Sequence, residues 1–228
     1  NKHLLNILKP TIIITGISRG FGKALAETFL AEKHTVIGIG RSSDIQDSGF
    51  AFLELDLGNW MAVESFQLPT LPAAGEIILI NNAGVLGNIG RISEMEKDIS
   101  GNVMQVNVVA PMQLTRKFAK ACGDRHPFTL VNISSGAGKR PIPSWAGYCA
   151  SKAALDMFSE TFLQEEKELG RNTKVYAVSP GVIDTDMQAS IRSADQHDFS
   201  SLENFRNLKE NNELETASQI SLKLLKLL

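Results

Sequence analysis

The chain has 228 residues, of which 43% are hydrophobic and 21% charged, and its formal net charge is −2 at pH 7. This length and composition predict one large soluble domain with a full hydrophobic core. The nearly balanced charge argues against a nucleic-acid-binding protein, since such proteins typically carry an excess of basic residues. The apolar runs are too short to span a bilayer. We therefore expect neither a nucleic acid nor a membrane as a partner.

Two cysteines, four histidines and the first ten residues bear on location and metal binding. Cys122 and Cys149 lie far apart without metal-binding spacing, which predicts reduced thiols in a cytoplasmic protein. Residues 1–10, NKHLLNILKP, lack the ordered regions of a secretory signal peptide. The histidines are scattered, with no H-x-x-x-H pattern and no nearby pair of acids, so we expect no metal site.

Apolar runs alternate with amphipathic stretches along the chain. Strands are expected at residues 11–15, 35–40, 51–57, 76–80, 128–134 and 173–180. Helical spacing of apolar side chains is found in residues 21–33, 104–122 and 149–169. This alternation predicts an α/β fold of the Rossmann type, with a doubly wound parallel sheet and helices on both faces. No change in composition divides the chain, so we expect residues 1–228 to form a single domain.

The segment TGISRGFG joins the first expected strand to the first expected helix. Its glycines allow a tight turn and let the backbone approach a pyrophosphate group at the helix N-terminus. A turn that needs glycines only for its own shape is the alternative, and the strand–loop–helix context favours the nucleotide site. The cofactor-binding residues expected here are Gly16, Ser18, Arg19, Gly20, Phe21 and Gly22.

The end of the second expected strand predicts which dinucleotide is bound. An acidic residue there would accept hydrogen bonds from the ribose 2′-hydroxyl of NAD, but the sequence continues with Arg41 and Ser42. Arg41, together with Arg19, suits a 2′-phosphate. Asp44 would still reach the ribose if the loop bent back. The balance predicts NADP(H), with NAD left open.

SWAGYCASKAAL places Tyr148 four residues ahead of Lys152, so both would share one face of a helix. A nearby ammonium would lower the pKa of the phenol and let it donate a proton to a carbonyl oxygen. Ser135 follows the fifth expected strand, and its hydroxyl could hold the same oxygen. Taken alone, a Tyr-x-x-x-Lys spacing also arises by chance.

Five segments in order resemble the short-chain dehydrogenase/reductase superfamily: TGISRGFG, NNAG, VNVVAP, NISSGAGKRPIPSWAGYCASK and SPGVIDTDM. They cover nearly the whole chain. SPGVIDTDMQASIR and FRNLKENNEL further resemble the branch that contains benzil reductases forming (S)-benzoin, which in turn resemble sepiapterin reductases. The superfamily normally has a seventh strand after its last helix. Here we expect that strand to be missing, because the sequence ends in the helix-like QISLKLLKLL.

The resemblance implies roles for individual residues. Tyr148 would be the general acid, Lys152 would lower its pKa and bind the nicotinamide ribose, and Ser135 would orient the carbonyl group. Asn107 would hold a water that links Lys152 to solvent. The other implied cofactor contacts are Asp56 and Leu57 at the adenine, Asn82, Ala83 and Gly84 beside its ribose, and Pro180, Gly181, Val182 and Thr185 at the carboxamide.

Residues 188–212 form a long polar connection with apolar side chains at intervals, which predicts a lid over the site. We expect Trp145, Met187 and Ile191 to form an apolar wall beside Tyr148 and Ser135, suited to flat or aromatic ketones. The helices expected at 104–122 and 149–169 are more apolar than one core-facing stripe requires. The resemblance implies that they pair in a homodimer.

These features together predict a cytoplasmic NADPH-dependent carbonyl reductase for a small ketone or diketone, similar to benzil reductases. A sepiapterin reductase and a 3-oxoacyl-carrier-protein reductase are alternatives within the same chemistry. Lys139 and Arg140 give a slight basic patch that a carrier protein would need. A regulatory protein that senses NADP without turnover is the alternative from another class, and the Tyr148/Lys152 pair speaks against it.

Overall fold

The computed structural model describes residues 9–95 and 100–228. The expectation about a signal peptide in residues 1–10 therefore falls mostly outside the described part. Six strands form one parallel sheet in the order β3-β2-β1-β4-β5-β6. The strands are β1 (Thr11–Thr15), β2 (Thr35–Gly40), β3 (Phe50–Glu54), β4 (Ile77–Asn81), β5 (Phe128–Ile133) and β6 (Thr173–Val178). The order reverses between β1 and β4. The predicted single-domain Rossmann-type fold is confirmed.

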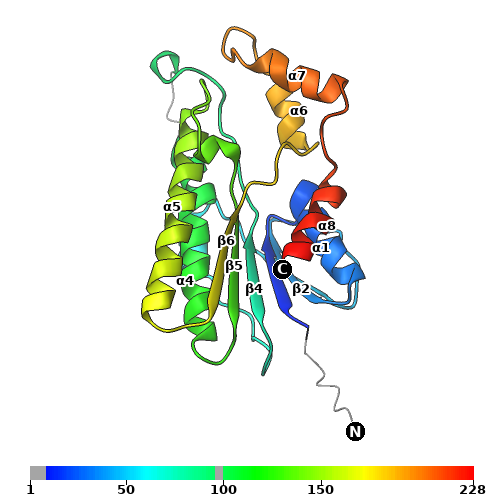
Figure 1. Cartoon of the computed structure of the whole chain (residues 1–228), viewed down its shortest axis with the longest axis vertical. Helices are drawn as coiled ribbons and strands as arrows, with labels where there is room; N and C mark the ends of the chain where they lie inside the picture. Colours follow the sequence, from blue (N-terminus) through cyan, green and yellow to red (C-terminus); the bar gives the residue numbers. More distant parts are fainter. Residues whose placement is uncertain (1–8, 96–99) are drawn as a thin grey trace.

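Helices cover both faces of the sheet (Figure 1). Helices α4 and α5 lie on one face and α1 and α8 on the other, while α6 and α7 lie beyond the carboxyl ends of the strands. The helices are α1 (Gly20–Ala31), α2 (Trp60–Ser65), α3 (Ser100–Met104), α4 (Ala110–Cys122), α5 (Ala146–Glu168), α6 (Asp186–Arg192), α7 (Leu202–Glu210) and α8 (Ala217–Leu227). Short turns are η1 (Ile92–Glu94), η2 (Gln105–Val109) and η3 (Gly136–Gly138).

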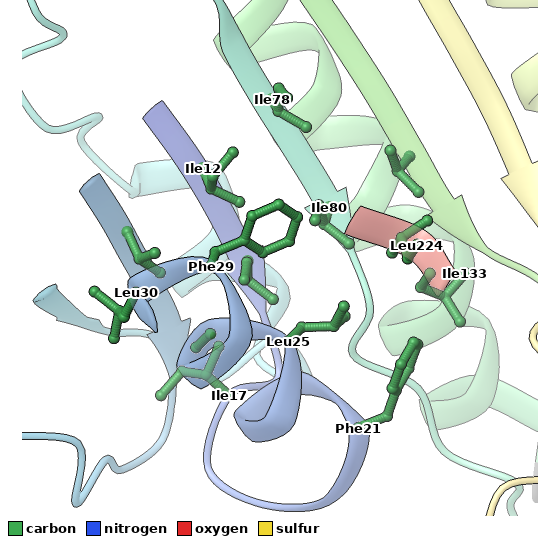
Figure 2. Packing of buried hydrophobic residues seen from close by; sticks show 14 of the residues in the cluster. Ile12, Ile17, Phe21, Leu25, Phe29, Leu30, Ile78, Ile80, Ile133 and Leu224 are labelled. Atoms are coloured by element: carbon green, nitrogen blue, oxygen red, sulfur yellow. The ribbon is translucent and has the colours of Figure 1, made fainter. Parts of the chain in front are cut away.

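The alternating side chains of β1 build two cores at once, because neighbours on a strand point to opposite faces. Ile12 belongs to the cluster under α1 and α8, where Phe29 and Leu224 are also buried. Figure 2 shows these side chains meeting between the sheet and the two helices. Ile13 belongs to the cluster under α4, with Phe118 fully buried. Burial on both faces explains why TIIIT has no polar alternation.

The helix expected at 104–122 contains an irregular turn. Residues Gln105–Val109 form one turn of π-helix, in which Ala110 donates its N–H to the Gln105 carbonyl five residues earlier. Pro111 has no N–H to give the Asn107 carbonyl, so a regular α-helical bond is impossible at that point. Such turns often occur at functional sites. Here the turn carries Asn107.

Two other element boundaries differ from expectation near the site. The third strand ends at Glu54 instead of residue 57, so Asp56 and Leu57 lie in the loop after it. Helix α5 begins at Ala146 and not at residue 149, which places Tyr148 inside the first turn of the helix. Both shifts move predicted site residues onto the carboxyl edge of the sheet.

The expected lid is a helical excursion that closes at its base. It contains α6 and α7, and the N–H of Asp184 donates to the Glu215 carbonyl at 3.0 Å where the chain returns. Lys209 adds an ion pair of 2.6 Å to the Asp184 carboxylate. Helix α8 then begins at a capping box between Thr216 and Gln219. None of the helices in the described part of the chain combines the length and apolar character that a bilayer crossing needs.

Candidate active site

A cavity of about 1540 Å³ lies at the carboxyl edge of the sheet. It runs from the glycine loop past Asn82 and Gly84 to Ser135 and Tyr148. This is the switch point between β1 and β4, where ligands of doubly wound sheets bind. Of the residues predicted for the site, all line the cavity except Ser42 and Asn107.

Close backbone packing explains the glycine loop. A Cβ on Gly16 would lie 2.8 Å from the Ala83 Cα, and one on Gly22 would lie 2.2 Å from the Gly16 carbonyl oxygen. Asn82 secures the same junction by donating from Nδ2 to the Thr15 and Gly16 carbonyls at 3.0 and 3.2 Å. Because no side chain caps the N-terminus of α1, its first N–H groups remain able to bind a phosphate.

The loop after β2 carries the residues that the sequence predicts to distinguish NADP from NAD. Ser18 Oγ donates to the Ser42 carbonyl at 2.7 Å, which joins this loop to the glycine loop. Asp44 does not line the cavity, and its carboxylate accepts a hydrogen bond of 2.7 Å from Lys23 on α1. Arg41 is exposed at the cavity rim. The bent-loop alternative for Asp44 therefore loses its support.

Arg19, the second predicted phosphate ligand, has a partner elsewhere. Its guanidinium pairs with the Asp186 carboxylate at 3.1 Å, and both side chains are more than two-thirds exposed, at 74% and 71%. The pair joins the glycine loop to the first turn of α6. Arg41 is thus the better placed of the two arginines to bind a 2′-phosphate.

Tyr148, Lys152 and Ser135 meet at one end of the cavity. The Lys152 Nζ lies 5.6 Å from the centre of the Tyr148 ring and donates a hydrogen bond of 2.7 Å to the Ile133 carbonyl. Both side chains are buried, with exposed fractions of 3% and 8%. Ser135 begins the η3 turn, and its Oγ accepts the N–H of Ala137 at 3.2 Å. Its hydroxyl also hydrogen-bonds the phenol.

Burial dominates the protonation of this pair. It raises the pKa of Tyr148 above 10, and the hydrogen bond with Ser135 offsets part of that rise. Burial also lowers the pKa of Lys152 to about 8, against the opposing charge of Asp156. The pKa of Tyr148 thus lies above its usual value and not below it as expected, because desolvation of the phenol raises it.

Asn107 lies behind the cavity wall and holds three parts of the site together. Its Oδ1 accepts the N–H of Val85 at 2.8 Å, while Nδ2 donates to the Val85 carbonyl at 2.9 Å and to Ser151 Oγ at 3.0 Å. Ser151 Oγ donates in turn to the Tyr148 carbonyl at 2.8 Å. Asn107 Oδ1 and Lys152 Nζ both lie within 3.6 Å of where a Cβ on Gly84 would be.

Aromatic side chains form the opposite wall. Trp145 meets the Tyr148 ring edge-on at 5.7 Å and stacks on Phe199 at 5.4 Å. Phe205 lies 5.3 Å from the Trp145 ring. Ile191 is buried in the same cluster. Phe205 lines the cavity together with Trp145, Met187 and Ile191, while the fully buried Phe199 supports Trp145 from behind the wall.

Several lining residues were not predicted. They include residues 85–89, Asn102, Arg140 and Phe205. Residues 85–89 directly follow NNAG at the end of a strand, and this position alone would have predicted that they lie at the ligand site. Among the histidines, His197 lies within 4.8 Å of Glu94 and Asp198 ligand atoms, so the expectation that no histidine has a nearby acid pair is wrong. These are mainly surface groups, and they lie outside the cavity lining.

Comparisons with known proteins agree with this geometry. The family described as short chain dehydrogenase matches residues 10–196. A benzil reductase ((S)-benzoin forming) of Bacillus subtilis is 40% identical over 95% of this chain and 92% of its own. An NADPH-dependent pterin aldehyde reductase of Arabidopsis thaliana is 33% identical, covering 79% of this chain and 77% of its own. A 4-hydroxyisoleucine dehydrogenase solved with NADH has a TM-score of 0.76 at 26% identity, covering 96% of this chain and 90% of its own.

The fold and the site define an oxidoreductase that acts on carbonyl or alcohol groups with a nicotinamide cofactor. The chain belongs to the short-chain dehydrogenase family, in the branch of the benzil reductases with sepiapterin reductase-like neighbours.

We expect Lys152 to make stability depend on pH between about 8 and 10.5. Lysine titrates near 10.5 in the unfolded chain and at about 8 in the folded protein. Between these values the unfolded chain binds more protons, so the free energy of unfolding rises with pH. In denaturant titrations, the stability of wild type relative to Lys152→Met should increase by about 3 kcal/mol from pH 7 to pH 10.5.

The matched control is Lys167→Met, which changes an exposed lysine on the same helix and should show no such trend. A stability difference between wild type and Lys152→Met that stays constant over this range would contradict the burial of a charged ammonium.

Proposed function

We propose that the protein is an NADPH-dependent carbonyl reductase that acts on a small ketone or diketone, as benzil reductases do. The observation that carries the proposal is the joint position of Ser135, Tyr148 and Lys152 in a cavity that continues to the glycine loop. The similarity to the Bacillus subtilis benzil reductase supports the substrate class. A regulatory protein without turnover would not need a buried acid and ammonium pair at this position.

The residues divide the work of reduction. A bound nicotinamide dinucleotide supplies the hydride. Ser135 and Tyr148 bind the carbonyl oxygen through their hydroxyls, and Tyr148 donates its phenolic proton to that oxygen as charge develops. The phenol carries this proton at neutral pH, and burial raises its pKa further. Lys152 would stabilise the phenolate that remains, and the family resemblance supports a role for Asn107 in holding a water that returns a proton through Lys152.

The cavity offers a matching surface to the cofactor. The N-terminus of α1 would bind the pyrophosphate, Lys152 the nicotinamide ribose, and Arg41 the 2′-phosphate. The other residues proposed to hold it are Gly16, Ser18, Arg19, Gly20, Phe21, Gly22, Ser42, Asp56, Leu57, Asn82, Ala83, Gly84, Tyr148, Pro180, Gly181, Val182 and Thr185. The similarity to the NADPH-dependent pterin aldehyde reductase of Arabidopsis thaliana supports NADPH as the cofactor.

The aromatic wall favours a flat substrate. Trp145, with Met187 and Ile191, presents apolar surface beside Tyr148, where an unpaired charge would be costly to bury. A charged carrier-protein substrate fits less well, because Lys139 is already paired with the Asp156 carboxylate at 3.2 Å. A pterin carbonyl, as in sepiapterin reductases, is the second candidate, supported by the similarity to such enzymes.

The two free cysteines, Cys122 and Cys149, agree with the cytoplasmic location that we propose.

Replacing the acid is the direct test of the function. Tyr148→Phe keeps the ring and removes the proton, so kcat for benzil should fall by about 10² to 10⁴, while NADPH binding should change little. Activity is followed by NADPH oxidation at 340 nm. Tyr176→Phe on β6, outside the cavity, is the control and should keep full activity. Near wild-type turnover by Tyr148→Phe would remove this residue from the mechanism.

Cofactor choice depends on Arg41 in this proposal. Arg41→Ala should weaken NADPH binding by about 1.5–3 kcal/mol, the value of a hydrogen bond to a charged group, and leave NADH binding nearly unchanged. Calorimetry with both cofactors measures the difference, and Arg206→Ala on α7 is the control. An equal loss for both cofactors would show that Arg41 has a structural role.

We further propose a homodimer that buries the outer faces of α4 and α5. Met112 on α4 is 41% exposed and Met157 on α5 is 62% exposed, so both helices present apolar side chains away from the core. Light scattering at micromolar concentration should give the mass of a dimer, and Met157→Glu should shift it toward the monomer. Leu222→Glu on α8 is the control, since Leu222 is 51% exposed on another helix. A wild-type monomer would contradict the proposal.

A further inference from the structure

A buried carboxylate on α5 has no part in the chemistry described above. Asp156 is only 5% exposed, and neither of its oxygens has a directed hydrogen bond in the described part of the chain. Its ionic contact is the Lys139 ammonium at 3.2 Å, which sits on a side chain that is 65% exposed. Burying a carboxylate with so little support is costly, so the charge itself is expected to have a use.

Asp156 lies directly behind the catalytic pair. Tyr148, Lys152 and Asp156 follow one another at intervals of four residues, so they lie on one face of α5, and all three are buried. The η3 turn packs against this face. A Cβ on Gly138 would lie 2.9 Å from Asp156 Oδ2 and 3.0 Å from the carbonyl carbon of Lys152. The same turn begins at Ser135 and ends beside Lys139.

We propose that Asp156 is a positioning residue that acts through Lys152: its carboxylate keeps Lys152 in the ammonium form beside Tyr148, and Lys139 pairs with the carboxylate from the solvent side and partly offsets its charge. The proposal rests on the proposed function only for the claim that catalysis needs this ammonium. The electrostatic link between the two side chains is independent of any substrate.

The charge of Asp156 is the interaction that opposes the loss of the Lys152 proton on burial. Among the described groups, the phenol ring of Tyr148 faces the Lys152 ammonium and Lys139 pairs with Asp156, while Cys149 and Arg140 line a shallow cavity together with Lys139. Asp156 is the anion in this group. Burial brings the pKa of Lys152 to about 8, close to neutral pH, while Asp156 acts in the opposite direction. Without that charge, Lys152 would lose its proton within the working range.

A double-mutant cycle on stability tests the link without any enzyme assay. The proteins are wild type, Asp156→Asn, Lys152→Met and the double variant, unfolded in denaturant at pH 7 and pH 10. At pH 7, Asp156→Asn should lower the folding equilibrium constant roughly tenfold more in wild type than in Lys152→Met, since one pKa unit is a factor of ten. At pH 10 Lys152 is neutral and the coupling should disappear. Equal coupling at both pH values would overturn the proposal.

The pH profile of kcat/KM supplies the functional readout. Asp156→Asn should move the alkaline limb to lower pH by roughly one unit, because Lys152 then loses its proton earlier. Lys139→Met removes the outer cation and should move the limb in the opposite direction, which also tests the proposal if Asp156→Asn does not fold. A lower plateau with an unmoved limb in both variants would mean a purely structural role. Absence of carbonyl reduction by wild type would refute the proposed function and leave the stability cycle valid.

Discussion

The site depends on a lysine ammonium placed inside the protein. Lys152 gives up water for one hydrogen bond of 2.7 Å to the Ile133 carbonyl at the end of β5, and burial brings its pKa to about 8. A charge in that position cannot be tolerated without other arrangements around it. The face of the Tyr148 ring lies 5.6 Å from the ammonium, and the charge of Asp156 opposes the effect of burial on the pKa of Lys152. The catalytic geometry therefore follows from the need to stabilise one cation.

The sheet determines where this cation can act. The chain turns in opposite directions after β1 and β4, and the cavity lies at the carboxyl ends of these strands. Gly16 lets the first loop lie directly on Ala83 in the second, so the glycine loop and the segment leading to Lys152 share one wall. A side chain at Gly16 or Gly22 would push that wall apart. The glycine loop and the surroundings of Lys152 are thereby linked through backbone packing.

Local sequence patterns predicted the fold, the glycine loop and the meeting of Ser135, Tyr148 and Lys152, because strand–loop–helix context fixes which residues follow each strand. They could not predict features that arise from tertiary burial. The raised pKa of Tyr148 reflects the burial of its side chain in the folded chain. The ion pair between Asp44 and Lys23 could not be predicted either, because it depends on the path that the loop after β2 takes in space. The π-turn at Asn107 has one local cause in the sequence, Pro111, which has no N–H for a regular helical hydrogen bond.

Trp145 connects the acid to the choice of substrate. Its ring touches Tyr148 on one side and Phe199 and Phe205 on the other, so the lid segment contributes to the environment of the phenol. Removing water in this way raises the pKa of Tyr148 and strengthens every electrostatic contact near it. In the proposed function, an aromatic substrate would complete the same apolar enclosure, because its flat ring would add to the side chains that already exclude water from the phenol.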